Sequence, residues 1–141
     1  MSRVCWDAML LIYLLEGNQE FRPRADSLLA RSRRRGDLLF TSCLAAGELM
    51  AGVERFDQPI KTAAVRKTLD EIGFRFLPFD ANAMRPFSFL RGREKLKVGD
   101  AINLACAASA GMDLYLTGDK QLVRLDVPGI QFIAEFSSSI L

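Results

Sequence analysis

The sequence predicts a three-layer α/β/α domain with a central, mostly parallel sheet of about five strands. Short apolar runs typical of buried strands alternate along the chain with longer helical stretches. A helix between two strands carries the chain back to the end of the sheet where the first strand began. This alternation therefore favours parallel strands. The chain has 141 residues, of which 50% are hydrophobic, so we expect one domain over residues 1–141 that buries a core without disulfides.

The strand predictions rest on short apolar segments, several of them rich in β-branched or aromatic residues. These segments are RVCW (3–6), LLFT (38–41), FRFLPF (74–79), LYLT (114–117) and IQFIA (130–134). Helices are expected between them, over residues 8–16, about 24–35, about 43–55, about 60–72, about 81–93 and 100–110. A glycine ends four of these helices, as a left-handed C-terminal cap requires: Gly17, Gly36, Gly73 and Gly111. Pro86 predicts a kink or a shorter fifth helix.

The composition narrows the possible chemistry. The chain contains no histidine, which excludes Ser-His-Asp and Cys-His nucleophilic sites and the usual zinc sites. Hydrolytic chemistry would therefore use carboxylates, and Mg²⁺ or Mn²⁺ is the metal that suits such oxygen ligands. Cys5, Cys43 and Cys106 form no CxxC pair and are interpreted as small core residues of a cytoplasmic protein. No apolar run reaches the about 20 residues of a membrane span.

Several acidic residues stand at element ends, where a parallel sheet binds its ligands. Asp7 directly follows the first predicted strand, Asp100 begins the last predicted helix, and Asp119 lies two residues past LYLT. Aspartate is also a favoured helix N-cap, so each of these three is open to either interpretation. Asp80 in LPFDANAM also stands between a predicted strand and a predicted helix, and we interpret it as a cap.

Glu48 favours the ligand interpretation. It lies well past the first turn of its predicted helix, which Thr41 or Ser42 would cap. Its neighbours on the helix surface include three small residues among Leu44, Ala45, Ala51 and Gly52. The sequence therefore predicts a carboxylate on a core-facing side of the helix, where it would coordinate a metal or pair with a cation.

Two polar residues accompany the acids as supporting candidates. Asn103 lies three residues after Asp100, on the same helix face, and either hydrogen-bonds Asp100 or holds a metal-bound water; we favour the first. Thr117 either supports the carboxylate of Asp119 or simply ends a strand, and we favour the second.

The pattern of motifs along the chain resembles the PIN domain, and within it the VapC-type ribonuclease toxins of bacterial and archaeal toxin–antitoxin pairs. The motifs are an Asp after the first strand, ELMAGV, DAINLACA and LTGD, which together span almost the whole chain. The resemblance places the family's catalytic and metal-binding acids on Asp7, Glu48, Asp100 and Asp119. It also makes the first and fourth strands neighbours, which leaves Asp80 outside the site. Met9 departs from the family pattern, which usually has Ser, Thr or Asn there.

The resemblance implies an endoribonuclease that uses Mg²⁺ or Mn²⁺ and leaves a 5′-phosphate and a 3′-hydroxyl. Asp7 and Asp100 would be the main metal ligands, and Glu48 and Asp119 would hold a second metal or position waters. Such a metal lowers the pKa of its bound water and neutralises charge at the leaving oxygen. The resemblance also implies a homodimer and a cognate antitoxin whose C-terminal segment covers the acidic pocket.

Two basic clusters are candidates for phosphate contacts. RGREKLK carries Arg91, Arg93, Lys95 and Lys97 just before Asp100, and we interpret these residues as RNA contacts. RSRRRG carries Arg31, Arg33, Arg34 and Arg35 at the end of a helix, where cations are favoured for structural reasons. We interpret this second cluster as a solvated helix end or a partner surface.

Two alternatives remain open at the level of sequence. A receiver-like signalling domain would bind Mg²⁺ and be phosphorylated on Asp80, with Lys120 assisting, but it would leave Glu48 without a role. A PIN-like module that binds RNA or a protein without cleaving it is the second alternative, which Met9 makes plausible.

Overall fold

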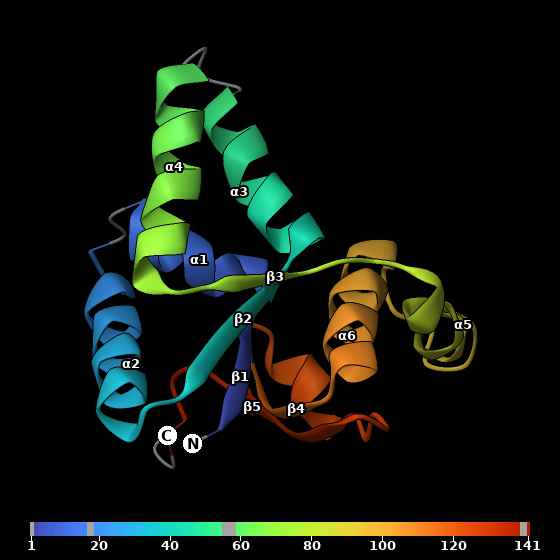
Figure 1. Cartoon of the computed structure of the whole chain (residues 1–141). Helices are drawn as coiled ribbons and strands as arrows, with labels where there is room; N and C mark the ends of the chain where they lie inside the picture. The colour runs from blue at the N-terminus through green and yellow to red at the C-terminus, as the bar shows by residue number, and fades with distance from the viewer. Residues whose placement is uncertain (1, 17–18, 55–58, 139–140) are drawn as a thin grey trace.

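The computed structural model describes residues 2–16, 19–54, 59–138 and 141, and for 59–61 it describes the backbone alone. A five-stranded sheet in the order β3-β2-β1-β4-β5 forms the middle of the molecule (Figure 1), and every strand pairing in it is parallel. Its strands are β1 (Arg3–Trp6), β2 (Leu38–Ser42), β3 (Arg75–Leu77), β4 (Met112–Thr117) and β5 (Ile130–Glu135). The predicted fold class is confirmed.

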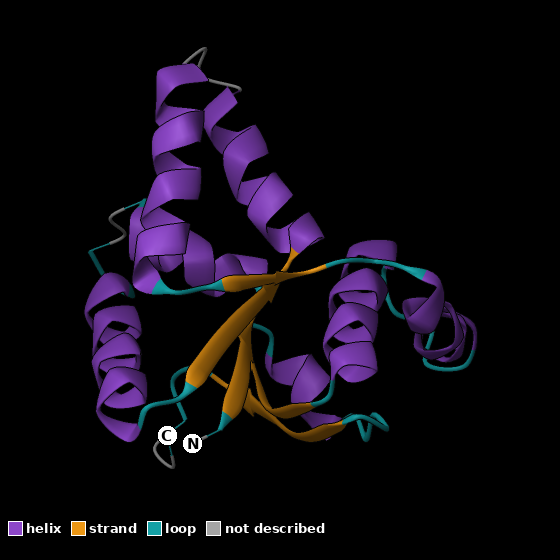
Figure 2. Ribbon diagram, in the orientation of Figure 1, coloured by secondary structure: helices purple, strands orange, loops and turns teal. Residues whose placement is uncertain are grey.

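Helices cover both faces of this sheet (Figure 2). They are α1 (Ala8–Leu15), α2 (Arg22–Arg35), α3 (Cys43–Glu54), α4 (Pro59–Ile72), α5 (Met84–Gly92) and α6 (Val98–Ala110), with short 3₁₀ helices η1 (Ala81–Ala83) and η2 (Lys120–Arg124). One core lies beneath α1 and α2, and α3 and α4 extend it; the other lies beneath α5 and α6. Since side chains alternate along a strand, β1 feeds both cores: Val4 and Trp6 enter the first, and Cys5 the second.

The chain reverses its direction of travel across the sheet at β1. From β1 it goes outward to β2 and β3, then crosses to β4 and β5 on the other side. The carboxyl ends of β1 and β4 therefore flank a topological switch point, which is where open α/β sheets bind ligands. This order also decides against the receiver-like alternative, because β3 lies at the edge and the loop that carries Asp80 does not follow a neighbour of β1.

The predicted elements differ from the observed ones mainly at their ends. The last long helix begins at Val98, so Asp100 is its third residue and Lys97 is the N-cap. The predicted helix over 81–93 divides into η1 and α5, and Pro86 falls in the first turn of α5, where its missing N–H costs nothing. Gly36, Gly73 and Gly111 have positive φ angles at helix ends, as expected; the prediction for Gly17 lies outside the described residues.

The cysteine interpretation holds for two of three residues. Cys5 and Cys106 are buried, whereas Cys43 is exposed as the first residue of α3, so its assignment to the core was wrong. The helix that follows Cys43 packs on the core through Ala45, Ala46 and Leu49 instead. Within the described residues, no helix combines the length and apolar character that crossing a membrane requires.

Candidate active site

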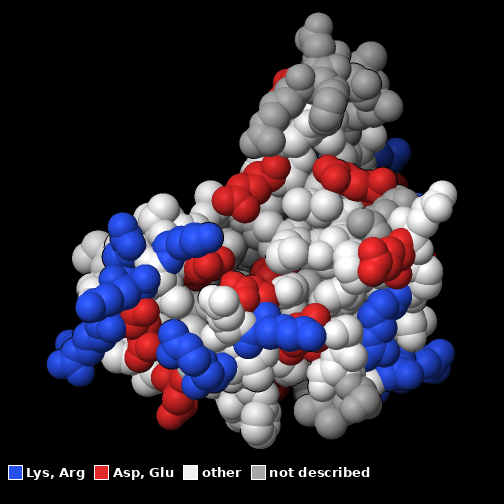
Figure 3. All heavy atoms as spheres, turned by 180° about the vertical axis from the view of Figure 1, so that it is seen from behind, with Lys and Arg blue, Asp and Glu red and all other residues white. Residues whose placement is uncertain are grey.

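A cleft of about 370 Å³ opens beyond the carboxyl ends of β1 and β4. It brings together the four predicted acids from four separate parts of the chain. The cleft is lined by Asp7, Ala8, Met9, Glu48, Lys97, Gly99, Asp100, Asn103 and Asp119. Figure 3 shows acidic side chains gathered near the middle of the corresponding face, with basic side chains toward the edge that α5 forms. Asp80 is not among the lining residues; it caps η1 by accepting a hydrogen bond from Asn82 N, as expected.

Asp7 is both the N-cap of α1 and the most buried acid of the cleft. Its Oδ1 accepts a hydrogen bond from Leu10 N at 3.2 Å, and its Oδ2 accepts one from Gly118 N at 3.0 Å. Burial raises the pKa of the Asp7 carboxyl, while hydrogen bonds from Thr117, Gly118 and the first turn of α1 act in the opposite direction. The cap and ligand interpretations are thus compatible, because capping uses only part of the acceptor capacity of a carboxylate.

Asp100 and Asp119 face each other across the cleft. Burial raises the pKa of Asp100, and so does the negative charge of Asp119, while the positive charge of Lys97 lowers it. Asp119 is the N-cap of η2 and accepts a hydrogen bond from Gln121 N at 2.9 Å. Two carboxylates that repel each other at a helix N-terminus form an environment that favours a bound cation.

Glu48 lies in the cleft, but not for the reason that the sequence suggested. Its side chain is exposed, so the prediction of a carboxylate on a core-facing side of the helix was wrong. The buried side of α3 is formed by Ala45, Ala46 and Leu49 instead. Glu48 reaches toward the start of α6, where a Cβ built on Gly99 would stand 3.8 Å from its Oε1. This distance places the Glu48 carboxylate within van der Waals reach of the residue before Asp100.

The supporting residues make contacts different from those expected. The Oδ1 of Asn103 accepts a hydrogen bond from the Ser42 hydroxyl, rather than bonding Asp100 as we favoured. Ser42 Oγ in turn accepts Ala45 N at 2.9 Å, so one hydroxyl caps α3 and links it to α6. Thr117 does end β4, but its buried hydroxyl also accepts Asp119 N at 3.0 Å and hydrogen-bonds the Asp7 side chain. Ser42 is thus one of the two residues expected to cap this helix, and only its bond to Asn103 was not foreseen from the sequence.

Met9 shapes one wall of the cleft. Its side chain is 42% exposed and lies against Gly118, where a Cβ would approach the Met9 Sδ to 2.7 Å. Gly118 also donates its backbone N–H to Asp7, so this residue contacts both Met9 and the acid. The thioether thus places an apolar surface where the PIN resemblance led us to expect a hydroxyl or an amide.

The donor set of the cleft fits a hard divalent cation. It offers carboxylate oxygens, which Mg²⁺ and Mn²⁺ prefer, and the cleft has space for the waters that Mg²⁺ retains. Among the residues that the structure describes, no three acids already stand close enough together to bind one ion. Carboxylates that share a cleft repel one another, and a bound cation would reduce this repulsion.

The raised pKa values of Asp7 and Asp100 predict how stability depends on pH without metal. Between the ordinary carboxyl value of 3.8 and the raised values, the folded chain binds more protons than the unfolded chain. The free energy of unfolding therefore falls as pH rises through this window. Because Asp100→Asn removes one titrating group, we expect its stability relative to wild type to increase from pH 4 toward neutrality, measured by urea unfolding in EDTA. A difference that stays constant with pH would contradict the assigned direction.

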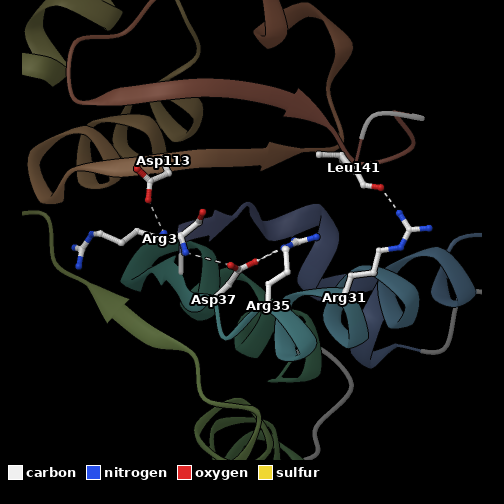
Figure 4. A network of polar contacts seen from close by, with 7 residues as sticks. Arg3, Arg31, Arg35, Asp37, Asp113 and Leu141 are labelled. Carbon is white, nitrogen blue, oxygen red and sulfur yellow. Dashed lines mark hydrogen bonds and ion pairs between the residues drawn. The ribbon is translucent and has the colours of Figure 1, made fainter.

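The two basic clusters have different surroundings. Lys97 lines the cleft, and Arg93 and Lys95 are exposed beside it, whereas Arg91 donates to Leu96 O at 2.9 Å and so holds the loop after α5. The α2 cluster lies on the other face of the sheet from α5, at the C-terminal end of α2 and just before β2. There Arg31 donates to Leu141 O, and Arg35 pairs at 2.9 Å with Asp37, which also accepts Ser2 N (Figure 4). Arg33 and Arg34 are exposed.

Comparison with known families decides the family of the chain. A family model described as the PIN domain matches residues 4–128. The chain belongs to the PIN-domain family. This PIN domain contains the four acids within the matched range, and the resemblance inferred from its motifs is confirmed at the family level. A search of curated protein sequences finds no match.

Solved structures share the fold of this PIN domain at low sequence identity. VapBC2 from Rickettsia felis, bound to a promoter DNA fragment, has a TM-score of 0.70 at 12% identity and covers 94% of this chain and 98% of its own. A toxin–antitoxin complex from Klebsiella pneumoniae has a TM-score of 0.67 at 23% identity, covering 90% and 94%. Mycobacterium tuberculosis VapC20, described as a sarcin-ricin loop cleaving toxin, has a TM-score of 0.64 at 16% identity, covering 87% and 96%.

Proposed function

We propose that this PIN domain is a metal-dependent endoribonuclease and the toxin of a VapC-type toxin–antitoxin pair in the cytoplasm. The observation that supports it most is the meeting of Asp7, Glu48, Asp100 and Asp119 in one cleft at the switch point of the sheet. Structural neighbours that are toxin–antitoxin complexes or an RNA-cleaving toxin support the biological role. A homodimer and a cognate antitoxin that covers the cleft are parts of the same proposal.

Each residue of the cleft has a part in this reaction. Asp7 and Asp100 would hold the Mg²⁺ or Mn²⁺ ion, and Glu48 and Asp119 would hold a second ion or position the attacking water. The metal supplies a water of lowered pKa and neutralises charge on the leaving oxygen. Lys97 would bind a non-bridging phosphate oxygen from the rim, since it is the cation that lines the cleft. Thr117 and Gly118 hold the carboxylate of Asp7 in place.

Met9 gives a specific reason to keep a second candidate. Its thioether stands where the family usually has a polar group, and a cleft with weakened metal affinity could bind RNA without cleaving it. The two candidates predict different behaviour with metal. A binding module would retain RNA whether or not a divalent ion is present, and the RNA would remain intact.

Removal and return of metal tests the proposal directly. We expect the purified chain to cleave an RNA pool with Mg²⁺ or Mn²⁺, to lose cleavage in EDTA, and to regain it when the ion is restored. Products should carry a 5′-phosphate and a 3′-hydroxyl, shown by ligation and kinase assays on their ends. Undiminished cleavage in EDTA, or products with a 2′,3′-cyclic phosphate, would contradict the proposed chemistry.

A further inference from the structure

A second hollow lies on α5, outside the acidic cleft. It is lined by Met84, Arg85, Ser88, Phe89 and Arg93, which we call the α5 groove. Their spacing places them along one side of the helix and its C-terminal end. Met84 is 60% exposed, among the most exposed large apolar side chains of the described residues. An exposed apolar side chain next to Arg85 suits a ligand with both charged and flat apolar parts.

The two arginines of the α5 groove have no acidic partners. Arg85 and Arg93 are exposed, and within the described residues neither forms an ion pair. Other arginines on the surface are paired, such as Arg66 with Asp70 and Arg124 with Glu94. Basic side chains cover the edge of the molecule that α5 forms (Figure 3). Unpaired positive charge of this kind is available to phosphates.

The α5 groove continues toward the cleft through a fixed loop. Arg91 donates to Leu96 O, and Leu96 N donates to Leu90 O at 3.1 Å, so the segment after α5 folds back on the helix. This segment ends at Lys97 in the cleft. Arg85 and Arg93 stand about 12 Å apart along the helix axis. Arg93 lies about 14 Å at most from Lys97 along the chain.

We propose that the α5 groove binds a single-stranded RNA segment and leads it into the acidic cleft, a proposal that rests on the nuclease function. Arg85 and Arg93 bind separate phosphates of one strand, and Lys97 binds the phosphate nearest the acids. Met84 and Phe89 contact base faces, which a duplex keeps stacked and an unpaired strand exposes. An acidic peptide would also match the arginines, but it would gain nothing from the apolar side chains of the α5 groove or from the continuity with the cleft.

Neutralising the two arginines tests the proposal against a matched control. The variant Arg85→Gln with Arg93→Gln is compared with Arg33→Gln plus Arg34→Gln, which removes the same charge from exposed arginines at the end of α2, on the other face of the sheet. The probe is a fluorescein-labelled, unpaired RNA of about twelve nucleotides, followed by anisotropy in EDTA at several salt concentrations. Loss of two phosphate contacts should lower the slope of log affinity against log salt by about 1.4 in the α5 variant. The α2 variant should keep the wild-type slope.

Cleavage assays separate the failure of this proposal from the failure of the nuclease function. The α5 variant should cleave the long RNA more slowly than wild type because its KM rises, and its KM for a trinucleotide should change less. Equal slopes for the two variants, a preference for duplex RNA, or tighter binding of a polyglutamate peptide than of RNA would overturn the α5 groove as an RNA path. A chain that cleaves nothing but shows the predicted slopes would overturn the nuclease function and leave the RNA path standing.

Discussion

Replacing Asp7 with asparagine should lower metal-dependent RNA cleavage at least about 100-fold, or about 2.7 kcal/mol of transition-state stabilisation. Asparagine keeps the size of the side chain and one acceptor for Leu10 N, so α1 remains capped. It removes the negative charge that a cation requires, and it places an N–H₂ group or a single oxygen where Gly118 N now meets a carboxylate oxygen. The rate constant with saturating Mn²⁺ or Mg²⁺ is the measurement.

Asp80→Asn is the matched control for that substitution. Asp80 also follows the sheet, caps a short helix and accepts a backbone N–H, at 3.1 Å from Asn82, but it lies outside the cleft. Asp80→Asn should therefore retain wild-type cleavage, and both variants should unfold within about 2 kcal/mol of wild type in urea. Equal cleavage by wild type and Asp7→Asn would remove Asp7 from the site, and loss of cleavage in a folded Asp80→Asn would show that the wrong acids were chosen.

Sequence reasoning succeeded where a local pattern of residue types is enough to locate an element. Apolar runs and terminal glycines located the strands and helices, because hydrophobic period and positive φ are local properties. The four acids line one cleft, since the parallel order brings the ends of β1 and β4 together, and their assignment as metal ligands stays a prediction. Asp7 shows why the choice between cap and ligand was unnecessary: it accepts two backbone N–H groups and still lines the cleft.

The failures concern side chains whose direction depends on tertiary packing. Glu48 was expected on a buried face, but its side chain is exposed and reaches toward Gly99 at the start of α6. Asn103 was expected to bond along its own helix, yet Ser42, 61 positions away, is its partner. Thr117 was expected to be only a strand residue, and its hydroxyl serves Asp7 and Asp119. Nothing in the local sequence specifies such long-range contacts, because they follow from the register of β1, β2 and β4.

Gly129 is the position where a single methyl group should destabilise the fold most. It occupies the third place of the Val127–Ile130 turn, with Pro128 before it, a φ of 101° and a hydrogen bond from Ile130 N to Val127 O. Its carbonyl accepts Met112 N at 2.9 Å and so aligns the start of β5 with β4. A Cβ at 129 would stand 2.3 Å from Ala108 O and 2.9 Å from Ala108 C, and both are backbone atoms of α6 that cannot rotate away.

Gly129→Ala should therefore lower the free energy of unfolding by roughly 3–5 kcal/mol, and the melting temperature by about 10 °C, measured by urea and thermal unfolding. Gly36→Ala separates the cost of a side chain at positive φ from the cost of the contact with Ala108. Gly36 also has a positive φ, 72°, but a Cβ there would meet nothing within 4 Å, so only the backbone cost of about 1–2 kcal/mol applies. The excess loss in Gly129→Ala then measures the contact with Ala108. Equal losses in the two variants would mean that α6 yields to the methyl group, and that the close approach of β5 to α6 does not stabilise the sheet edge.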